Sequence, residues 1–229
     1  MTKESPADSG ADLGFALRSL ARAARAGSLA TVTNAGQPFV SLVTPAFAAD
    51  FTALLLLSGL AEHTRHLRAE PRCALLVVGE NEGPNPQTTP RLTLIGRAEP
   101  VADAALRARY LARHPYAALY AGFGDFGLWR LVAEEVHYVG GFGVARRIAA
   151  AKFRPAPEAV AAIEAAAPAL IAEADPLGGG GGKIVALDPD GCDLACGEAV
   201  RRVAFPAPVA SAEEVRAALI GLARAARGE

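Results

Sequence analysis

The sequence predicts an α+β protein whose larger part is an antiparallel split β-barrel. About six apolar segments of strand length lie between residues 28 and 139, and most are joined by short turns. Asn34-Ala35-Gly36 is a hairpin signal, and Ala49-Asp50 marks a second turn. The glycine fingerprints of dinucleotide-binding and phosphate-loop α/β folds are absent from the sequence. Short turns with few intervening helices favour an antiparallel barrel over a parallel sheet.

The elements of this first part follow from periodicity. Apolar residues at helical spacing predict a helix over residues 13–26, and further helices are expected at 59–69 and 103–113. The second helix stops before Pro71, because the residue that precedes a proline disfavours helical geometry. Strands are predicted at residues 28–33, 38–47, 51–57, 73–79, 91–101 and 128–139.

The composition changes after Gly143, which predicts a second, smaller unit. The segment AAAKFRPAPE is a plausible linker, and an alanine-rich helix follows in which Pro168 should cause a kink or a split. GGGGG at 178–182 predicts a flexible connector, and KIVALDPDGCDLAC and EAVRRVAFP are then expected to form a small hairpin pair with a DPDG turn. Ser211 and Glu214 form a capping box before the last helix. The predicted domains are therefore residues 13–150 and a small α+β domain at 155–229.

The composition limits the function classes. The chain is 52% hydrophobic and 21% charged, which suits a globular protein, and its net charge of −1 gives no basic field for nucleic acid or for an anionic membrane. No signal-peptide core or membrane-length apolar run is present, so we expect a cytoplasmic protein that binds no nucleic acid and no membrane. Cys73, Cys192 and Cys196 are too few for a disulfide framework, and they lack a matching pair for zinc.

The segment SGLAEHTRH, residues 58–66, combines a helix start with polar groups. Ser58 can cap the helix, which leaves first-turn N–H groups free to bind an anion. His63, Thr64 and Arg65 add a ring N–H, a hydroxyl and a guanidinium, the groups that a terminal phosphate needs. Arg91 could add a second guanidinium if its strand lies alongside.

Two other interpretations of this segment compete with the phosphate site. His63 and His66 share one helical face, but the pair lacks an acidic ligand in register, so no metal site is predicted. The polar residues could also form only the solvated face of an amphipathic helix. Spacing alone favours this last interpretation over the phosphate site.

The order and spacing of several segments resemble the pyridoxamine 5′-phosphate oxidase-like flavoproteins, and more closely their haem-utilisation (HugZ-like) branch. These segments are LATV, FVSLVTPAF, LLLLSGLAEHTRHL, EPRCALLV, PRLTLIGRAEPV, RYLARHP, YAGFGDFGLWRL and YVGGFGVA. The resemblance covers roughly residues 15–147. It implies a split-barrel homodimer with FMN bound in the cleft between the protomers.

The resemblance also implies roles for individual residues. The segment SGLAEHTRHL would hold the FMN phosphate, and the strand VSLVTPAF would line the isoalloxazine ring. Trp129 would reach the site from the partner subunit, although a core tryptophan is at least as plausible. The predicted cofactor-binding residues are Ser41, Val43, Thr44, Ser58, His63, Thr64, Arg65, Arg91, Thr93 and Trp129.

The sequence also departs from the family pattern. Ser41 replaces an arginine that the oxidases carry, and His63 replaces a lysine of their phosphate segment, which weakens the expectation of a pyridoxal-type substrate. The C-terminal part resembles the small domain of the HugZ-like branch, through VALDPDGCDL, VRRVAFPAPV and AEEVRAALIGLARAAR. No histidine follows His137, so the usual source of a haem ligand in that domain is missing.

The leading hypothesis is an FMN-dependent oxidoreductase that acts as a homodimer on a small or flat substrate. FMN would supply the redox chemistry, and no protein acid or base stands out. The first alternative is a haem-binding or haem-degrading protein. The second is a cofactor-free regulatory module that binds another protein through the same cleft.

Overall fold

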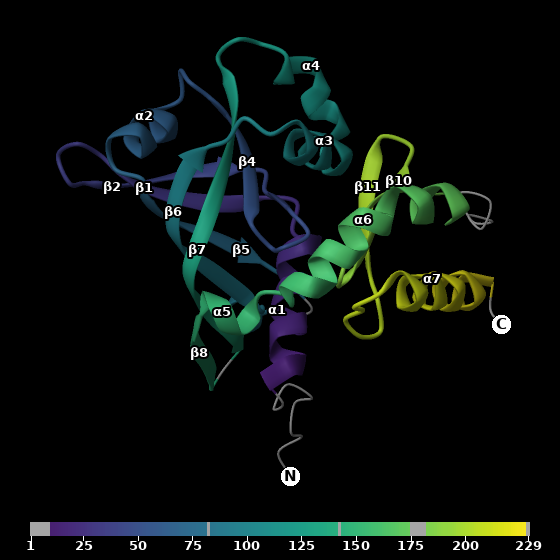
Figure 1. Cartoon of the computed structure of the whole chain (residues 1–229). Coiled ribbons are helices and arrows are strands. Elements are labelled where there is room, and N and C mark those ends of the chain that lie inside the picture. The colour runs from purple at the N-terminus through teal and green to yellow at the C-terminus, as the bar shows by residue number, and fades with distance from the viewer. Residues whose placement is uncertain (1–9, 82, 142, 175–181, 228–229) are drawn as a thin grey trace.

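The structure is a computed structural model that describes residues 10–81, 83–141, 143–174 and 182–227. Its larger part is a curled antiparallel sheet with the strand order β2-β1-β5-β6-β7-β4-β3, and β8 pairs with β7 (Figure 1). The predicted α+β fold with an antiparallel split barrel is confirmed. The strands are β1 (Gly27–Val32), β2 (Pro38–Val43), β3 (Ala46–Phe47), β4 (Ala53–Ser58), β5 (Arg72–Val78), β6 (Arg91–Pro100), β7 (Phe126–Gly141) and β8 (Val144–Ala149).

Helices surround this sheet and close its ends. They are α1 (Gly10–Ala23), α2 (Glu62–Ala69), α3 (Ala104–Arg113), α4 (Ala118–Ala121) and α5 (Ala150–Phe153), with short 3-10 turns η1 (Pro86–Thr88) and η2 (Pro115–Ala117). Asp103 caps α3, because its carboxylate accepts hydrogen bonds from the N–H groups of Ala105 and Leu106.

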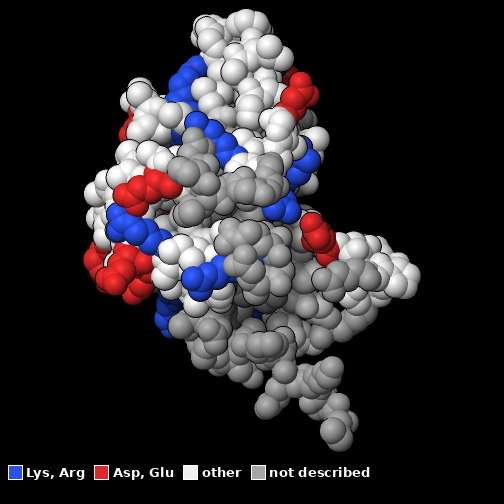
Figure 2. Space-filling view, turned by 90° about the vertical axis from the view of Figure 1, so that its right-hand side faces the viewer, with Lys and Arg blue, Asp and Glu red and all other residues white. Residues whose placement is uncertain are grey.

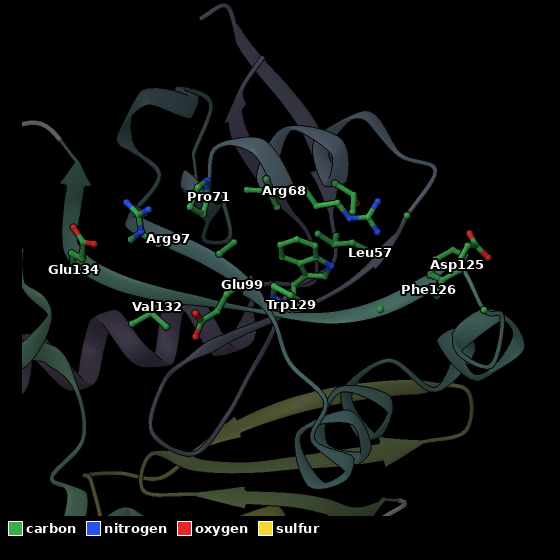
Figure 3. Close-up of a pocket in the computed structure, with 17 residues that line it drawn as sticks. Leu57, Arg68, Pro71, Arg97, Glu99, Asp125, Phe126, Trp129, Val132 and Glu134 are labelled. Carbon is green, nitrogen blue, oxygen red and sulfur yellow. The ribbon is translucent and has the colours of Figure 1, made fainter. Parts of the chain in front are cut away.

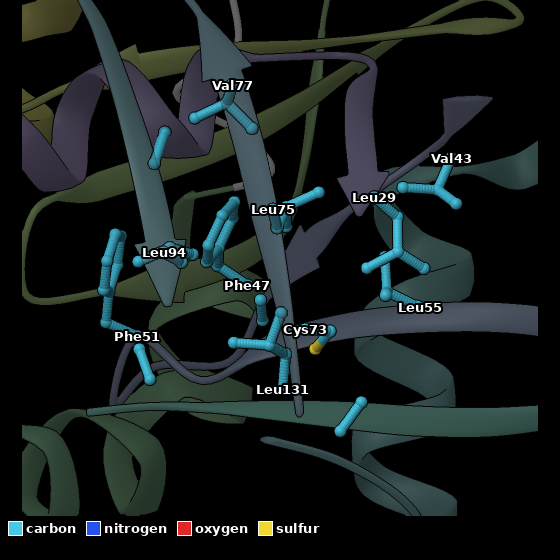
Figure 4. Packing of buried hydrophobic residues seen from close by; sticks show 14 of the residues in the cluster. Leu29, Val43, Phe47, Phe51, Leu55, Cys73, Leu75, Val77, Leu94 and Leu131 are labelled. Carbon is cyan, nitrogen blue, oxygen red and sulfur yellow. The ribbon is translucent and has the colours of Figure 1, made fainter. Parts of the chain in front are cut away.

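The leucine run of β4 is buried on both faces of the sheet. Leu55 and Leu57 pack in the main barrel core, together with residues such as Leu29, Leu75 and Leu94 (Figure 4). Leu54 and Leu56 point the other way, into a second cluster with α3 and α4. Side chains alternate along a strand, so a continuous leucine run fits a strand that is covered on both sides.

A β-bulge interrupts the pairing of β6 with β7. Ile95 pairs with Glu135 and Gly96 pairs with Ala133, so Glu134 is an extra residue on β7. A Cβ atom at Gly96 would lie 2.1 Å from the carbonyl oxygen of Val132. Only glycine fits at this position, and the bulge therefore depends on it.

The C-terminal unit, from α6 to α7, is a three-stranded sheet packed against two helices (Figure 1). It contains α6 (Pro157–Ala174), β9 (Lys183–Asp188), β10 (Gly191–Cys196), β11 (Ala199–Ala204) and α7 (Ala212–Arg227). The unit has its own apolar cluster, which includes Ile163, Leu187 and Val215. One half of the predicted capping box is present, because Ser211 Oγ accepts the N–H of Glu214. In return, the Glu214 carboxylate accepts the N–H of Ala210 rather than that of Ser211.

Buried charges join the C-terminal unit to the barrel. Asp190 accepts three hydrogen bonds from Arg18 of α1, at 2.7, 2.9 and 3.1 Å. Asp188 accepts hydrogen bonds from Arg109 of α3 and from Arg202 of β11, both at 2.6 Å. The whole group, here called the ionic cluster, comprises Arg18, Arg22, Arg109, Arg113, Arg202, Asp188, Asp190 and Asp193.

The structure corrects three predictions about these elements. The segment AAAKFRPAPE, residues 149–158, is only in part a linker: its first residue ends β8, residues 150–153 form α5, and α6 begins at Pro157. The strand expected at 38–47 is divided into β2 and β3. Helix α6 is not split at Pro168, since Ile163, Leu170 and Ala174 on either side of the proline pack into one apolar cluster. The predicted connector at 178–182 lies outside the described residues except for Gly182.

Charge is mixed on the described surface. On the face shown in Figure 2, Lys and Arg alternate with Asp and Glu and leave no large area of one sign. Within the described residues, no helix has the length and apolar character needed to cross a membrane. The cytoplasmic location stays a prediction.

Candidate functional site

A cavity of about 860 Å³ lies beside α2 (Figure 3). We call it the α2 cavity. Its walls come from the end of β4, from α2, from the last residues of β6 and from the first half of β7. Its lining includes Leu57, Gly59, Thr64, Leu67, Arg68, Pro71, Arg97, Glu99, Asp125, Phe126, Trp129, Val132 and Glu134.

Thr64 lines the cavity and has a hydroxyl group without a hydrogen-bond partner. Thr64 is 0% exposed, and its Oγ1 has no hydrogen-bond partner among the described residues. Thr64 lies in the first turn of α2, where no side chain caps the helix. The buried hydroxyl of Thr64 is therefore a donor without a partner at the wall of the cavity, whereas the N–H of Thr64 already donates to the carbonyl oxygen of Ala61.

Arg68 lies one helical turn after Thr64 and also lines the cavity. Its guanidinium lies close over Gly59, since a Cβ there would be 3.1 Å from Arg68 Nη2 and 3.2 Å from the carbonyl oxygen of Asp125. The guanidinium forms no ion pair or hydrogen bond within the described part of the chain. Arg68 thus offers an uncommitted positive charge next to Thr64.

Ser58 does not cap α2, contrary to the prediction. Its Oγ donates to the carboxylate of Asp125 at 2.6 Å and accepts the N–H of Leu60 at 3.2 Å. The N-cap residue is Ala61 instead. The helix starts later than expected because residues 58–61 form a turn that is fixed to the loop before β7, where Gly59 N–H donates to Asp125 at 2.6 Å.

Trp129 forms part of the apolar wall. It is 4% exposed and belongs to the main barrel core, and it also lines the α2 cavity of its own chain. Figure 3 shows it near the middle of the cavity, between Asp125 at one end and Glu134 at the other. Its approach to the cofactor of a partner subunit stays a prediction.

His63 and Ser41 are brought together, but on the other side of α2. Ser41 Oγ lies 3.0 Å from His63 Nδ1, and Thr31 Oγ1 lies 3.1 Å from His66 Nδ1. Burial lowers the pKa of His63, and the nearby His66 lowers it further. His63 is therefore mainly neutral at pH 7 and adds no positive charge to an anion site. The described residues contain no group of three His, Cys, Asp or Glu side chains that could hold a metal.

The other predicted residues lie away from the cavity of this chain. Arg65 is exposed and pairs with Glu62. Arg91 donates to the carbonyl oxygens of Gln87 and Thr89, both at 3.0 Å. Val43 is buried in the core, Thr44 Oγ1 lies 2.9 Å from the hydroxyl of Tyr110, and Thr93 pairs with His137 in the sheet.

Arg91 lies far from the α2 cavity because it stands at the opposite end of strand β6. It opens β6, whereas Arg97 and the three residues after it line the cavity. Six residues of extended chain separate Arg91 from Arg97, or about 20 Å. Within one chain, the guanidinium groups that line the cavity are those of Arg68 and Arg97. Arg68 could have been found from its i+4 spacing to Thr64, but nothing local in the sequence identifies Arg97.

The sheet and the cavity together define a split-barrel protein with a cavity beside helix α2. The chain belongs to the pyridoxamine 5′-phosphate oxidase family, since the model of that family matches residues 15–140. The resemblance to this family and to its haem-utilisation branch is confirmed by this match and by the relatives that follow.

Three relatives are informative. The chain is 41% identical over 113 residues to the non-canonical haem oxygenase of the Arabidopsis thaliana chloroplast; this covers 48% of the chain and only 34% of that protein. A protein of unknown function from Agrobacterium tumefaciens is 28% identical, with a TM-score of 0.75 over 96% of this chain and 98% of that chain. A haem-binding protein from Mycobacterium smegmatis is 28% identical, with a TM-score of 0.59 over 100% of both chains.

Proposed function

We propose that the α2 cavity binds a planar cofactor with an anionic end and that the protein uses it for redox chemistry. The observation that carries this proposal is the buried, unpaired hydroxyl of Thr64, which lines a cavity large enough for a cofactor. An unsatisfied buried hydroxyl costs roughly 1–3 kcal/mol, so a ligand that accepts its hydrogen bond regains that energy.

FMN is the cofactor that the geometry favours. Thr64 and Arg68 would hold its phosphate, because a hydroxyl and a guanidinium both bind phosphate oxygens. Leu57, Leu67 and Trp129 would exclude water from one side of the ring. FMN, when bound, supplies electron and hydride transfer, and the chain supplies binding and orientation.

Haem is the second candidate, and the relatives favour it. The Arabidopsis thaliana relative is a haem oxygenase, and the Mycobacterium smegmatis protein that aligns over the whole chain binds haem. The α2 cavity does not fit haem iron, however, because the described residues that line it include no His, Cys, Met or Tyr. These four side chains are the usual axial ligands. Haem would therefore have to bind through its carboxylates and its ring.

The proposal includes a homodimer that completes the open side of the site. Val40 and Leu42, on the edge strand β2, are 61% and 77% exposed, and Leu60, next to cavity-lining Gly59, is 78% exposed. Such apolar residues at a sheet edge and beside a cavity suit a buried interface. Light scattering should give twice the mass of the chain, and a monomer at micromolar concentration would contradict the dimer.

An absorption spectrum of the purified protein, followed by titration with FMN, riboflavin and haem, tests the function. Flavin binding through the phosphate predicts that FMN binds at least tenfold more tightly than riboflavin, as one or two charge-assisted hydrogen bonds would give. An intense haem band on reconstitution, with no response to FMN, would favour the second candidate. Binding of neither cofactor would contradict the proposal and favour the cofactor-free regulatory module.

A further inference from the structure

The α2 cavity has a second charged end, opposite Asp125. Figure 3 shows Arg97 and Glu134 at one end of the cavity, Asp125 and Phe126 at the other end, and Trp129 between them. Arg97 lines the cavity three residues before Pro100, which pairs with Trp129 across the sheet. Three residues of strand correspond to about 10 Å, so a ring over the indole can place one substituent near Arg97.

The β-bulge builds this end of the cavity. Glu134 is the extra residue of the bulge, and Val132, which pairs with Arg97, also lines the cavity. Gly96 allows the close approach of the two strands just before Arg97, since a Cβ there would meet the Val132 carbonyl oxygen at 2.1 Å. Bulges next to functional sites commonly redirect side chains. The placement of Glu134 beside Arg97 therefore depends on an irregularity of the sheet.

Arg97 is an exposed cation near Glu70: the pKa of that carboxylate is lowered mainly by hydrogen bonds from Arg72 and to a smaller degree by the charge of Arg97. Its guanidinium forms no ion pair or hydrogen bond within the described part of the chain. Its cross-strand neighbour Arg72 is neutralised by Glu70, at 2.7 Å, and the nearby Glu99 is engaged by Arg130, also at 2.7 Å. Arg97 therefore keeps its N–H donors for an anion in the cavity, although the carboxylates of Glu70 and Glu134 lie near it.

We propose that Arg97 is a specificity-determining residue that binds a carboxylate of a ligand lying over Trp129. The proposal rests on the proposed function, that a planar cofactor occupies the α2 cavity. Glu134 beside Arg97 repels anions, and it repels a doubly charged phosphate more than a singly charged carboxylate. Asp125 lies at the opposite end of the cavity and repels anions there as well, so the acidic residues alone do not distinguish the two ends. The difference lies in the donors, because the Thr64 hydroxyl adds to the guanidinium of Arg68, whereas Arg97 offers a guanidinium alone.

The carboxylate can belong to the cofactor or to a second ligand. Haem carries two carboxylates of its own, whereas an FMN-bound site would take the carboxylate of a small aromatic substrate. In both cases the guanidinium of Arg97 binds a carboxylate. Two pairs of probes, whose members differ only in the carboxylate, distinguish the two sources. The pairs are haem and haem dimethyl ester for the free protein, and benzoate and benzamide for the FMN-loaded protein.

The experiment measures the affinity ratio of each pair in the wild-type protein, in Arg97→Gln and in Arg146→Gln. Arg146 is a matched control, an exposed strand arginine on β8 that does not line the cavity. For each probe pair that the wild-type protein binds, we expect the probe with the carboxylate to bind about tenfold more tightly than the probe without it. Arg97→Gln should abolish this preference, Arg97→Lys should restore part of it, and Arg146→Gln should retain it.

Failure of this inference is distinct from failure of the proposed function. Cofactor binding with an affinity ratio that Arg97→Gln leaves unchanged overturns the role of Arg97 and leaves the cofactor proposal standing. A wild-type protein that binds neither FMN nor haem overturns both. The ratio is informative even if Arg97→Gln lowers stability, because misfolding affects both members of a pair alike.

Discussion

Thr64 combines complete burial with an unused hydroxyl, and this combination sets it apart from its neighbours. A buried hydroxyl without a partner lowers stability by roughly 1–3 kcal/mol. Thr31, on the neighbouring strand, is equally buried, but its hydroxyl lies 3.1 Å from His66 Nδ1. The two threonines therefore differ in what their hydroxyl groups contribute to the free energy of unfolding.

Thr64→Val should leave the melting temperature unchanged or raise it, because the substitution removes an unpaired polar group while keeping the shape. The same change should weaken cofactor binding about tenfold, as the loss of one hydrogen bond to a charged group predicts. Thr31→Val should do the reverse, lowering the free energy of unfolding by about 1 kcal/mol with little effect on binding. Thermal unfolding and cofactor titration of both variants check this. Destabilisation by Thr64→Val with unchanged affinity would contradict it.

At the residue scale, the sequence identifies residues 58–66 as a segment that can bind an anion. It does not identify which of their side chains line the cavity. Consecutive residues of a helix point about 100° apart. His63 therefore contacts Ser41, Thr64 faces the cavity, and Arg65 pairs with Glu62 at the surface. Which of the three faces the cavity depends on how α2 packs against β1 and β2. That packing is a property of the tertiary structure.

The β-bulge between β6 and β7 is the element on which the far end of the cavity depends. It leaves Glu134 unpaired and requires a close approach at Gly96. Periodicity predicted both strands nearly to their ends, since apolar alternation is a local signal. It could not predict the bulge, because one glycine in a strand fits many backbone arrangements.

Gly96→Ala should destabilise the protein strongly, by about 2–4 kcal/mol, because the added Cβ would overlap the Val132 carbonyl oxygen. Gly221→Ala is the control. Gly221 lies within α7, with nothing within 4 Å of an added Cβ, so this variant should gain about 0.5–1 kcal/mol. Urea unfolding of the two variants measures both effects. Equal stability of Gly96→Ala and wild type would contradict the bulge geometry.

At the scale of the whole molecule, the ionic cluster makes the C-terminal unit part of one structure with the barrel. Its three aspartates come from the hairpin of β9 and β10, and they meet arginines from α1, α3 and β11. Burial alone would raise the pKa of Asp188, but the charges of Arg202 and Arg22 and the hydrogen bond from Arg202 outweigh it. The pKa is held well below its usual range.

Asp188→Asn should cost about 3–5 kcal/mol, because it leaves buried arginines without their carboxylate. Glu173→Gln removes a surface ion pair with Arg216 and should cost at most about 1 kcal/mol. Chemical denaturation of both variants at pH 7 compares the two costs. Similar small losses would show that the cluster does not couple the two units.

The same cluster predicts acid sensitivity. A carboxylate whose pKa is lower in the folded state stabilises the protein fully above its unfolded pKa, and this stabilisation is lost as the pH falls. For Asp188 the loss should begin as the pH drops toward 3.8, the ordinary value of the group, and continue below it. Unfolding free energies measured from pH 7 to pH 3 should decline less steeply for Asp188→Asn than for wild type. Parallel declines would contradict this assignment.

Only part of this arrangement was predictable from the sequence. The DPDG turn and the arginines of the first helix are visible, but their distance of about 170 residues in the chain conceals the contact between Arg18 and Asp190. Pairing across such a separation leaves no periodic signal, because it depends on how two units dock. The barrel topology was predictable because the turns are short and the family resemblance fixes their order.

The central claim is that the α2 cavity holds an anionic cofactor through Thr64 and Arg68. Its most direct test is equilibrium titration of wild type, Arg68→Gln and Arg65→Gln with FMN and with haem, followed by absorbance. Arg68 lines the cavity, whereas Arg65 on the same helix pairs with Glu62 at the surface. We predict that Arg68→Gln raises the Kd of the bound cofactor about tenfold or more and that Arg65→Gln changes it less than about twofold. Equal effects of the two substitutions, or no binding by wild type, would contradict the claim.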